Sequence, residues 1–326
     1  MIRAFPIVLA LAVAGCATRF DVQGHRGTRG LGPENTLPAF AKALEIGVDT
    51  LELDVGVTKD GVMVVAHDPW LNPNLARGPD GRWLDARGAN LADLTYEEVL
   101  RYDVGRLKPG TAYAKAFPDQ VPVDGTRIPR LSELFALVKR SGQRTVRFNI
   151  ETKISPLAPQ ETLAPEPFAR KLIAEIRAAG MASRSTIQSF DWRTLQVAQK
   201  LAPEIPTVYL TAQGAYDTIC TGAGAGNART DPRDCGPSAW TAGFQLKDHG
   251  SVPKMVKAAG GAVWSPRYND IDAASVKEAH ALGLEVIVWT VNSPETIAKM
   301  LDLGVDGIIS DRPDLVKKMV SGTNFR

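Results

Sequence analysis

The sequence lacks several features that mark other classes of protein. Its 38 basic residues are balanced by 36 acidic ones, so the positive excess typical of nucleic-acid-binding proteins is missing and we expect no nucleic-acid partner. It has 3 cysteines, and their spacing excludes a CxxC-type redox or zinc site. The apolar run at residues 4–14 is too short to span a bilayer, which takes about 20 residues. These absences leave room for an enzyme with a small-molecule substrate.

The N-terminus has the pattern of an export signal. Arg3 precedes the apolar run, which ends in Val13-Ala14-Gly15-Cys16 and resembles the bacterial lipobox. An ordinary secretory signal cleaved near Cys16-Ala17 is the alternative, and both would export the protein. We expect a signal peptide over residues 1–15 and a lipidated tether over residues 16–19 that begins at Cys16. The expected location is the periplasm, with the lipid anchor in the outer rather than the inner membrane.

The two remaining cysteines, Cys220 and Cys235, lie in a segment rich in Gly, Ala, Asp and Pro over residues 214–238. In an exported protein such a pair predicts a disulfide. Two free buried thiols are the alternative, which the polarity of the segment disfavours.

Strand-like and helix-like segments alternate through the rest of the chain, over residues 20–322. Eight apolar, β-branched runs predict strands: 20–24, 48–57, 145–150, 185–188, 207–210, 262–264, 285–290 and 307–309. Eight amphipathic stretches predict helices: 36–45, 131–139, 167–179, 192–201, 252–259, 273–281, 294–303 and 313–320. Eight βα units predict an α/β protein with a (β/α)₈ TIM barrel. A doubly wound open sheet is disfavoured, because no Gly-rich dinucleotide fingerprint follows the first strand.

Two segments interrupt the alternation. Residues 69–126 are turn-rich, with one helical piece at 96–101, and separate the second strand from its helix; residues 214–238 form a second interruption after the fifth strand. In a barrel, insertions of this kind lie at the face where active sites form, so we expect both to shape the mouth of the site.

Acidic residues in phase at strand ends predict a metal site. Glu52 and Asp54 form an i, i+2 pair on the second strand, and Glu151 ends the third, so all three side chains can point into one opening. Clustered carboxylates repel one another without a cation, and their hard oxygen atoms suit Ca²⁺ or Mg²⁺. Separate salt bridges to nearby basic residues are the alternative.

Histidines and basic residues at the same strand ends suit phosphodiester chemistry. His25 ends the first strand, and His67 ends the run that follows the second. Hydrolysis needs a base for the nucleophile and an acid for the leaving alkoxide, and a histidine can serve as either. Arg26 and Lys153 are suited to holding the phosphate. Phe190 and Trp264 could form an apolar wall of the pocket or pack in the core.

These residues carry a resemblance to a known family. The segments His25-Arg26-Gly27, Pro33-Glu34-Asn35-Thr36, Glu52-Leu53-Asp54-Val55 and His67-Asp68 look like the signature of the glycerophosphodiester phosphodiesterase family. Further matches over the rest of the chain are Glu151-Thr152-Lys153, Trp289-Thr290-Val291-Asn292 and Asp306-Gly307-Ile308-Ile309-Ser310-Asp311.

The resemblance implies a TIM barrel with an insertion after strand two and a role for each matching residue. By resemblance, His25 and His67 are the acid/base pair, and Glu52, Asp54 and Glu151 bind a divalent metal. Arg26 and Lys153 hold the phosphate, and Trp289 lines the pocket.

The function that follows is metal-dependent hydrolysis of glycerophosphodiesters to sn-glycerol 3-phosphate and an alcohol. Two alternatives remain at this point. One is a phospholipase-like phosphodiesterase that acts on lysolipid or sphingolipid head groups, although neither insertion has a sustained apolar run. The other is a surface-binding lipoprotein without activity, which would have no physical reason to keep both histidines and all three carboxylates.

Overall fold

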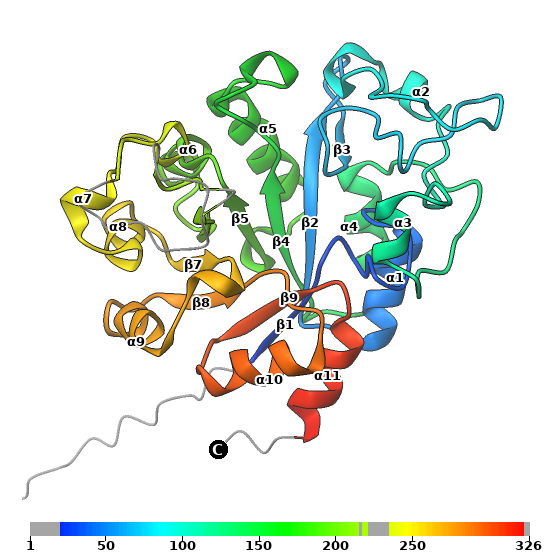
Figure 1. Cartoon of the computed structure of the whole chain (residues 1–326). Coiled ribbons are helices and arrows are strands. Elements are labelled where there is room, and N and C mark those ends of the chain that lie inside the picture. Colours follow the sequence, from blue (N-terminus) through cyan, green and yellow to red (C-terminus); the bar gives the residue numbers. More distant parts are fainter. Residues whose placement is uncertain (1–19, 215–216, 221–234, 323–326) are drawn as a thin grey trace, which may run out of the picture.

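The chain folds into a closed barrel of parallel strands surrounded by helices (Figure 1). The computed structural model describes residues 20–214, 217–220 and 235–322, so the predicted signal peptide, tether and Cys16 lie outside the described residues. Hydrogen-bonded pairing runs β1-β9-β8-β7-β6-β5-β4-β2, and a further β1–β2 pairing closes the ring. The barrel strands are β1 (Asp21–Gly24), β2 (Thr50–Val57), β4 (Arg147–Thr152), β5 (Ser185–Ser189), β6 (Thr207–Thr211), β7 (Val263–Pro266), β8 (Glu285–Val288) and β9 (Gly307–Ser310). The predicted TIM barrel is confirmed.

The outer helices follow the predicted amphipathic stretches closely. They are α1 (Leu37–Ile46), α4 (Leu131–Arg140), α5 (Pro165–Ala178), α6 (Trp192–Leu201), α8 (Val252–Ala258), α9 (Ala273–Ala281), α10 (Pro294–Asp302) and α11 (Pro313–Gly322). Side-chain caps explain several starts: Thr36 accepts from the backbone N–H of Ala39, and Asp272 and Ser293 cap α9 and α10 in the same way. No helix of the described ranges is long and apolar enough to cross a membrane.

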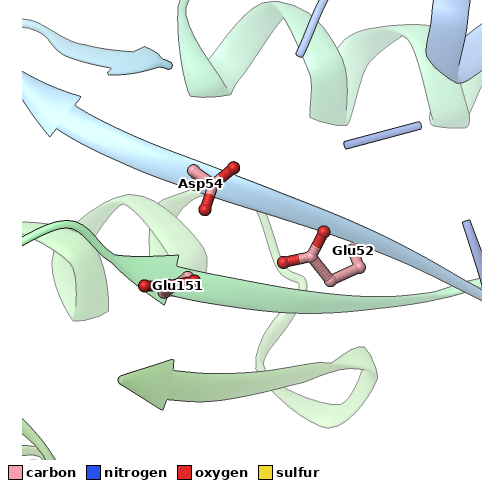
Figure 2. A group of neighbouring side chains, drawn as sticks. All are labelled: Glu52, Asp54 and Glu151. Carbon is pink, nitrogen blue, oxygen red and sulfur yellow. The ribbon is translucent and has the colours of Figure 1, made fainter. Parts of the chain in front are cut away.

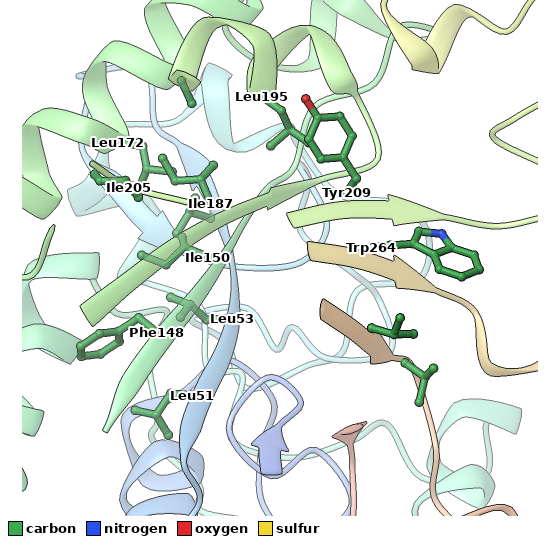
Figure 3. Packing of buried hydrophobic residues seen from close by; sticks show 14 of the residues in the cluster. Leu51, Leu53, Phe148, Ile150, Leu172, Ile187, Leu195, Ile205, Tyr209 and Trp264 are labelled. Carbon is green, nitrogen blue, oxygen red and sulfur yellow. The ribbon is translucent and has the colours of Figure 1, made fainter. Parts of the chain in front are cut away.

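The outward and inward faces of the barrel strands contact different sets of residues. Outward-facing side chains such as Leu51, Ile150 and Tyr209 pack against the helices (Figure 3). Inside the barrel a smaller apolar cluster is formed by Val208, Val263, Ile287 and Ile309. Inward polar side chains on β1, β4 and β5 hydrogen-bond one another: Asn149 Nδ2 donates to Gln23 Oε1 and to Gln188 Oε1, each at 3.0 Å.

A short antiparallel strand precedes the first insertion and shares a small core with it. Strand β3 (Met63–Val65) pairs with β2, and the elements η1 (Leu91–Asp93), α2 (Tyr96–Val99) and α3 (Ala112–Ala116) follow it. The buried apolar residues of this core are Val64, Leu71, Ala76, Leu91, Tyr96, Val99 and Ile128. The predicted helical piece is present as α2.

The second insertion follows β6, which is the fifth strand of the barrel. Cys220 and Cys235 form the predicted disulfide, with a sulfur–sulfur distance of 2.09 Å. The elements η6 (Ala239–Thr241) and α7 (Leu246–His249) come next. Three further 3₁₀ turns complete the described structure: η2 (Pro159–Glu161), η3 (Ala182–Arg184) and η7 (Tyr268–Asp270).

Candidate active site

Three acidic side chains meet at the carboxyl ends of β2 and β4. Asp54 pairs directly with Glu151 in the strand register, and Glu52 lies one inward position earlier on β2 (Figure 2). Each offers an oxygen atom that lies within 4.8 Å of the other two, and all three residues are buried. The predicted cluster is therefore present, and its oxygen donors are those that a hard divalent cation prefers.

The three carboxyl groups differ in how readily they lose a proton. Burial, together with the charge of Asp54, raises the pKa of Glu52 well above its usual range. Burial also raises the pKa of Glu151 to about 7, against the opposing charge of Lys153. Burial acts on Asp54 in the same direction, but Lys153, His67 and Arg26 hold the pKa of Asp54 below its usual range. Ionising all three groups at once therefore needs another positive charge.

Amide and backbone donors fix the orientation of this cluster. Gln188 Nε2 donates to Glu52 Oε1 at 2.6 Å, and the backbone N–H of Arg26 donates to Glu52 Oε2 at 2.9 Å. Asn35 Nδ2 donates to Asp54 Oδ2 at 2.9 Å. Lys153 Nζ lies 2.8 Å from Glu151 Oε1 and 3.7 Å from Asp54 Oδ1. Contacts of this kind hold metal ligands in place.

His25 is anchored by a buried carboxylate. Its Nδ1 lies 2.7 Å from Asp311 Oδ1, and its Nε2 lies 4.0 Å from Glu52 Oε2. Because a carboxylate only accepts, the proton belongs on Nδ1, which leaves the lone pair on Nε2. Burial lowers the pKa of His25 to about 4 against the opposing charge of Asp311. The imidazole is therefore neutral at physiological pH.

His67 has the same arrangement with a different acid. Its Nδ1 lies 2.9 Å from Asp68 Oδ1, and Asn72 holds the other oxygen of Asp68 at 2.6 Å. Burial lowers the pKa of His67, and the positive charges of Arg26 and Lys153 add to the effect. The site thus holds two neutral histidines, each oriented through Nδ1.

These groups line a cavity of about 800 Å³ that has a polar and an apolar side. The polar lining includes His25, Arg26, Glu52, His67, Glu151 and Lys153. The apolar side includes Leu157, Phe190, Leu210, Trp240 and Trp289. Phe190 and Trp289 meet edge to face, with ring centroids 5.3 Å apart. Asp54 is 1% exposed and lies behind the cavity wall, in contact with Lys153 and Arg26.

The prediction that Trp264 lines the pocket is wrong. Trp264 is on the outward face of β7, is 2% exposed, and belongs to the large apolar core together with Leu51, Ile150 and Tyr209 (Figure 3). Its Nε1 donates to Thr211 Oγ1 at 2.9 Å. The neighbouring Val263 faces the barrel interior, so strand alternation places Trp264 on the opposite side.

The two insertions contribute unequally to the cavity. Asp217 and Thr218, from the disulfide-bonded segment, are among its lining residues, as is Trp240 just after it. No residue of the first insertion, 69–126, lines the cavity, contrary to the expectation that both would shape its mouth. That insertion contacts the loop between β1 and α1 instead.

Comparison with known proteins agrees with this geometry. The sequence profile of the glycerophosphoryl diester phosphodiesterase family matches residues 25–315. The chain belongs to this family. The predicted family and the predicted enzyme class, a phosphoric diester hydrolase, are thereby confirmed.

Relatives of the family match over nearly the full length. A glycerophosphodiester phosphodiesterase from Caldanaerobacter subterraneus is 29% identical over 299 residues, which cover 92% of this chain and 97% of the relative. A Silicibacter pomeroyi structure assigned as a glycerophosphoryl diester phosphodiesterase is 35% identical, covers 94% of both chains and has a TM-score of 0.80. An Oleispira antarctica phosphodiesterase, solved with the product sn-glycerol-3-phosphate, is 20% identical and covers 93% of this chain and 97% of its own, with a TM-score of 0.62. The last of these shows the shared fold.

Several residues of this phosphodiesterase site were not predicted from the sequence. Asp311, Glu34 and Gln188 hold predicted site residues, yet none was singled out as a site residue. Gln188 and Asp311 had a detectable signal, because each is in phase with inward-facing residues at the end of a strand. Glu34 follows a turn with no regular period, so strand alternation could not place it.

Proposed function

We propose that this protein hydrolyses glycerophosphodiesters to sn-glycerol 3-phosphate and an alcohol, with a divalent metal and with His25 and His67 as acid and base. The observation that carries the proposal is the pair of neutral histidines on one cavity beside the three-carboxylate cluster. Both imidazoles donate through Nδ1 to a carboxylate, so both present Nε2 for proton transfer.

The charge balance supports a bound cation. We count the charged residues on the polar side of the cavity and the charged residues that contact them, leaving out the His67–Asp68 pair. Acidic residues outnumber basic ones in this set. With Glu52 and Glu151 ionised, five carboxylates face three cations: Glu34, Glu52, Asp54, Glu151 and Asp311 against Arg26, Arg29 and Lys153. Ca²⁺ or Mg²⁺ held by Glu52, Asp54 and Glu151 would offset this deficit, and when bound it would polarise the phosphoryl group and counter charge on its oxygen atoms.

The residues of the chain divide the remaining work. Arg26 and Lys153 hold the phosphate, because both are cations at the cavity wall beside the acidic cluster. One histidine takes the proton of the nucleophile and the other protonates the leaving alcohol. The nucleophile is water or the neighbouring glycerol hydroxyl, and detection of a cyclic phosphate intermediate distinguishes the two.

The apolar side of the cavity favours one second candidate. Leu157 is 72% exposed at the cavity wall, near Phe190 and Trp240 in the same lining. Such a wall could accept the apolar part of a lysolipid, so lysophospholipid head-group cleavage is the alternative substrate class.

Release of glycerol 3-phosphate tests the function directly. Purified protein with Ca²⁺ or Mg²⁺ should release it from glycerophosphocholine or glycerophosphoethanolamine, and a chelator should abolish the release. Release of the head-group alcohol from lysophosphatidylcholine, without cleavage of the two glycerophosphodiesters, would favour the second candidate. Release from none of these substrates would refute the proposal. The choice of product follows the Oleispira antarctica protein, which holds sn-glycerol-3-phosphate.

We also propose that the protein is exported and lipid-anchored at Cys16, in the periplasm and on the outer membrane. The support is the apolar run that ends in Val13-Ala14-Gly15-Cys16.

A further inference from the structure

The loop between β1 and α1 has a backbone that needs support. Arg26 has a φ of 51° and Asn35 a φ of 54°, although neither is glycine. Residues other than glycine rarely adopt this left-handed backbone conformation, so the surrounding contacts must stabilise it. Within the loop, the backbone N–H of Asn35 donates to the Arg26 carbonyl at 3.0 Å.

One short segment of the first insertion, residues 111–121, makes hydrogen bonds to this loop, and we call it the clamp segment. Two of its bonds go to the loop backbone. Gln120 Nε2 donates to the carbonyl of Arg29 at 2.8 Å, and the backbone N–H of Val121 donates to the carbonyl of Leu31 at 3.0 Å. The clamp segment thus meets the loop that carries His25 and Arg26, although it does not line the cavity.

One side chain of the clamp segment acts on Arg26. The Tyr113 hydroxyl donates to Glu34 Oε2, and the other oxygen of Glu34 accepts from Arg26 Nη1 at 2.6 Å. Although burial opposes it, Arg26 and Arg29 hold the pKa of Glu34 below its usual range, so Glu34 is a charged acceptor. Tyr113 therefore fixes the carboxylate that orients the guanidinium of Arg26.

A second side chain acts on His25. The Phe117 ring lies under Arg29, with the guanidinium carbon 4.7 Å from the ring centroid. Arg29 donates through Nε and Nη2 to Asp311 at 2.7 and 3.0 Å, and Asp311 accepts from His25. Tyr113 and Phe117 also contact each other edge to face, with ring centroids 5.3 Å apart.

We infer that Tyr113 and Phe117 are positioning residues for the reaction, so that the first insertion sets the geometry of the catalytic loop instead of covering the substrate. Tyr113 acts on phosphate binding through Glu34 and Arg26. Phe117 acts on proton transfer through Arg29, Asp311 and His25. The inference rests on the proposed function, because it assigns these two steps to Arg26 and His25.

A purely structural role would give a different result. If the clamp segment only attached the insertion to the barrel, substitutions of Tyr113 and of Phe117 would both lower thermal stability and would change the kinetic constants in the same way. The two paths share one long contact, because Arg29 Nη1 also donates to the Tyr113 hydroxyl at 3.4 Å. Their other contacts end on different residues, Arg26 and His25, and therefore predict different kinetic effects.

Tyr113→Phe tests the first path, because it removes one hydroxyl and keeps the ring. We expect about a fivefold rise in KM and in the dissociation constant for inorganic phosphate, measured calorimetrically with Mg²⁺, because Glu34 loses a charge-assisted hydrogen bond. The turnover number kcat should stay within about twofold. Tyr96→Phe is the matched control. Its hydroxyl also contacts a carboxylate, that of Glu133 at 3.1 Å, but neither residue lines the cavity, so neither constant should change.

Phe117→Leu tests the second path. We expect kcat to fall about threefold with KM and phosphate affinity unchanged, because Arg29 loses its aromatic support. Equal effects of Tyr113→Phe and Tyr96→Phe, or the same change in kcat and KM from both clamp variants, would overturn the inference. Phosphate binding is read without turnover, so an inactive wild type that binds phosphate would refute only the proposed function. A wild type that binds no phosphate would refute both.

Discussion

The Nδ1 atom of His25 lies 2.7 Å from Oδ1 of Asp311, a residue 286 positions further along the chain. Arg29 and Asn292 hold the same carboxylate, with Asn292 Nδ2 at 2.7 Å from Oδ2. Asp311 therefore fixes both the tautomer and the direction of His25.

Asp311→Asn should lower kcat strongly. The amide cannot accept the Nδ1 proton as a carboxylate does, and the comparable substitution in a serine protease lowers kcat about 10⁴-fold. We expect a loss of at least about 100-fold in kcat, measured with saturating glycerophosphodiester and metal. Metal affinity should not change, because Asp311 is not among the three clustered ligands.

Asp68→Asn is the control on the other histidine. It alters the His67 partner in the same way, so a loss of similar size would indicate that both histidines transfer protons. An Asp311→Asn enzyme with kcat within threefold of the wild type would show that this contact has no role in catalysis.

Metal binding should release protons near neutral pH. In the metal-free protein the pKa of Glu151 is raised to about 7 and that of Glu52 lies well above its usual range, so both carry protons that a bound cation must displace. Metal affinity should therefore rise as pH increases through 7. Calorimetry of Mg²⁺ or Ca²⁺ binding in buffers of different ionisation enthalpy measures the proton count.

The same groups set the pH dependence of stability. The folded, metal-free protein binds more protons than the unfolded chain between the ordinary pKa of 4.5 and the raised value of about 7. The contribution of Glu151 to the free energy of unfolding should thus decrease as pH rises through this range.

Glu52→Gln should reduce the number of protons released when the metal binds. A metal affinity that does not change with pH would contradict the proposed ligand set.

Reduction of the disulfide should destabilise the protein. Cys220 and Cys235 are separated by 15 residues, and a crosslink over about 15 residues contributes roughly 3 kcal/mol to the free energy of unfolding. Denaturant titration of Cys220→Ser/Cys235→Ser beside the wild type measures the change. A double variant with unchanged stability would show that the crosslink has no energetic role.

The lipid anchor has a test of its own. Cys16→Ser should move the protein from the membrane fraction to the soluble fraction of cells that express it, because the proposed lipid would be attached to that sulfur. A Cys220→Ser variant is the control for loss of a cysteine. Unchanged partitioning of Cys16→Ser would refute the anchor.

Regular periodicity explains why much of the site could be predicted from the sequence. Glu52 and Asp54 are two residues apart on a strand, so their meeting with Glu151 follows from parallel pairing. The same alternation places Phe190 in the cavity, two positions after the inward-facing Gln188.

Irregular structure explains what could not be predicted. Arg26 and Asn35 have left-handed backbones that follow no sequence period. The bond from Tyr113 to Glu34 joins positions 79 residues apart. Nearness to a strand end left Trp264 open between the pocket wall and the core, and its phase on β7 decides for the core because it turns the side chain outward.

The closure of the barrel has a consequence for how the enzyme matures. Strand β1 lies between β2 and β9, so the first strand gains its second neighbour only after nearly the whole chain has been synthesised. Pairings between distant segments form slowly because their loop-closure entropy must be overcome first. His25 receives its partner Asp311 in the same late event, since Asp311 directly follows β9. An unfinished or unfolded chain therefore lacks an oriented His25, and catalytic competence should arise together with the last step of folding.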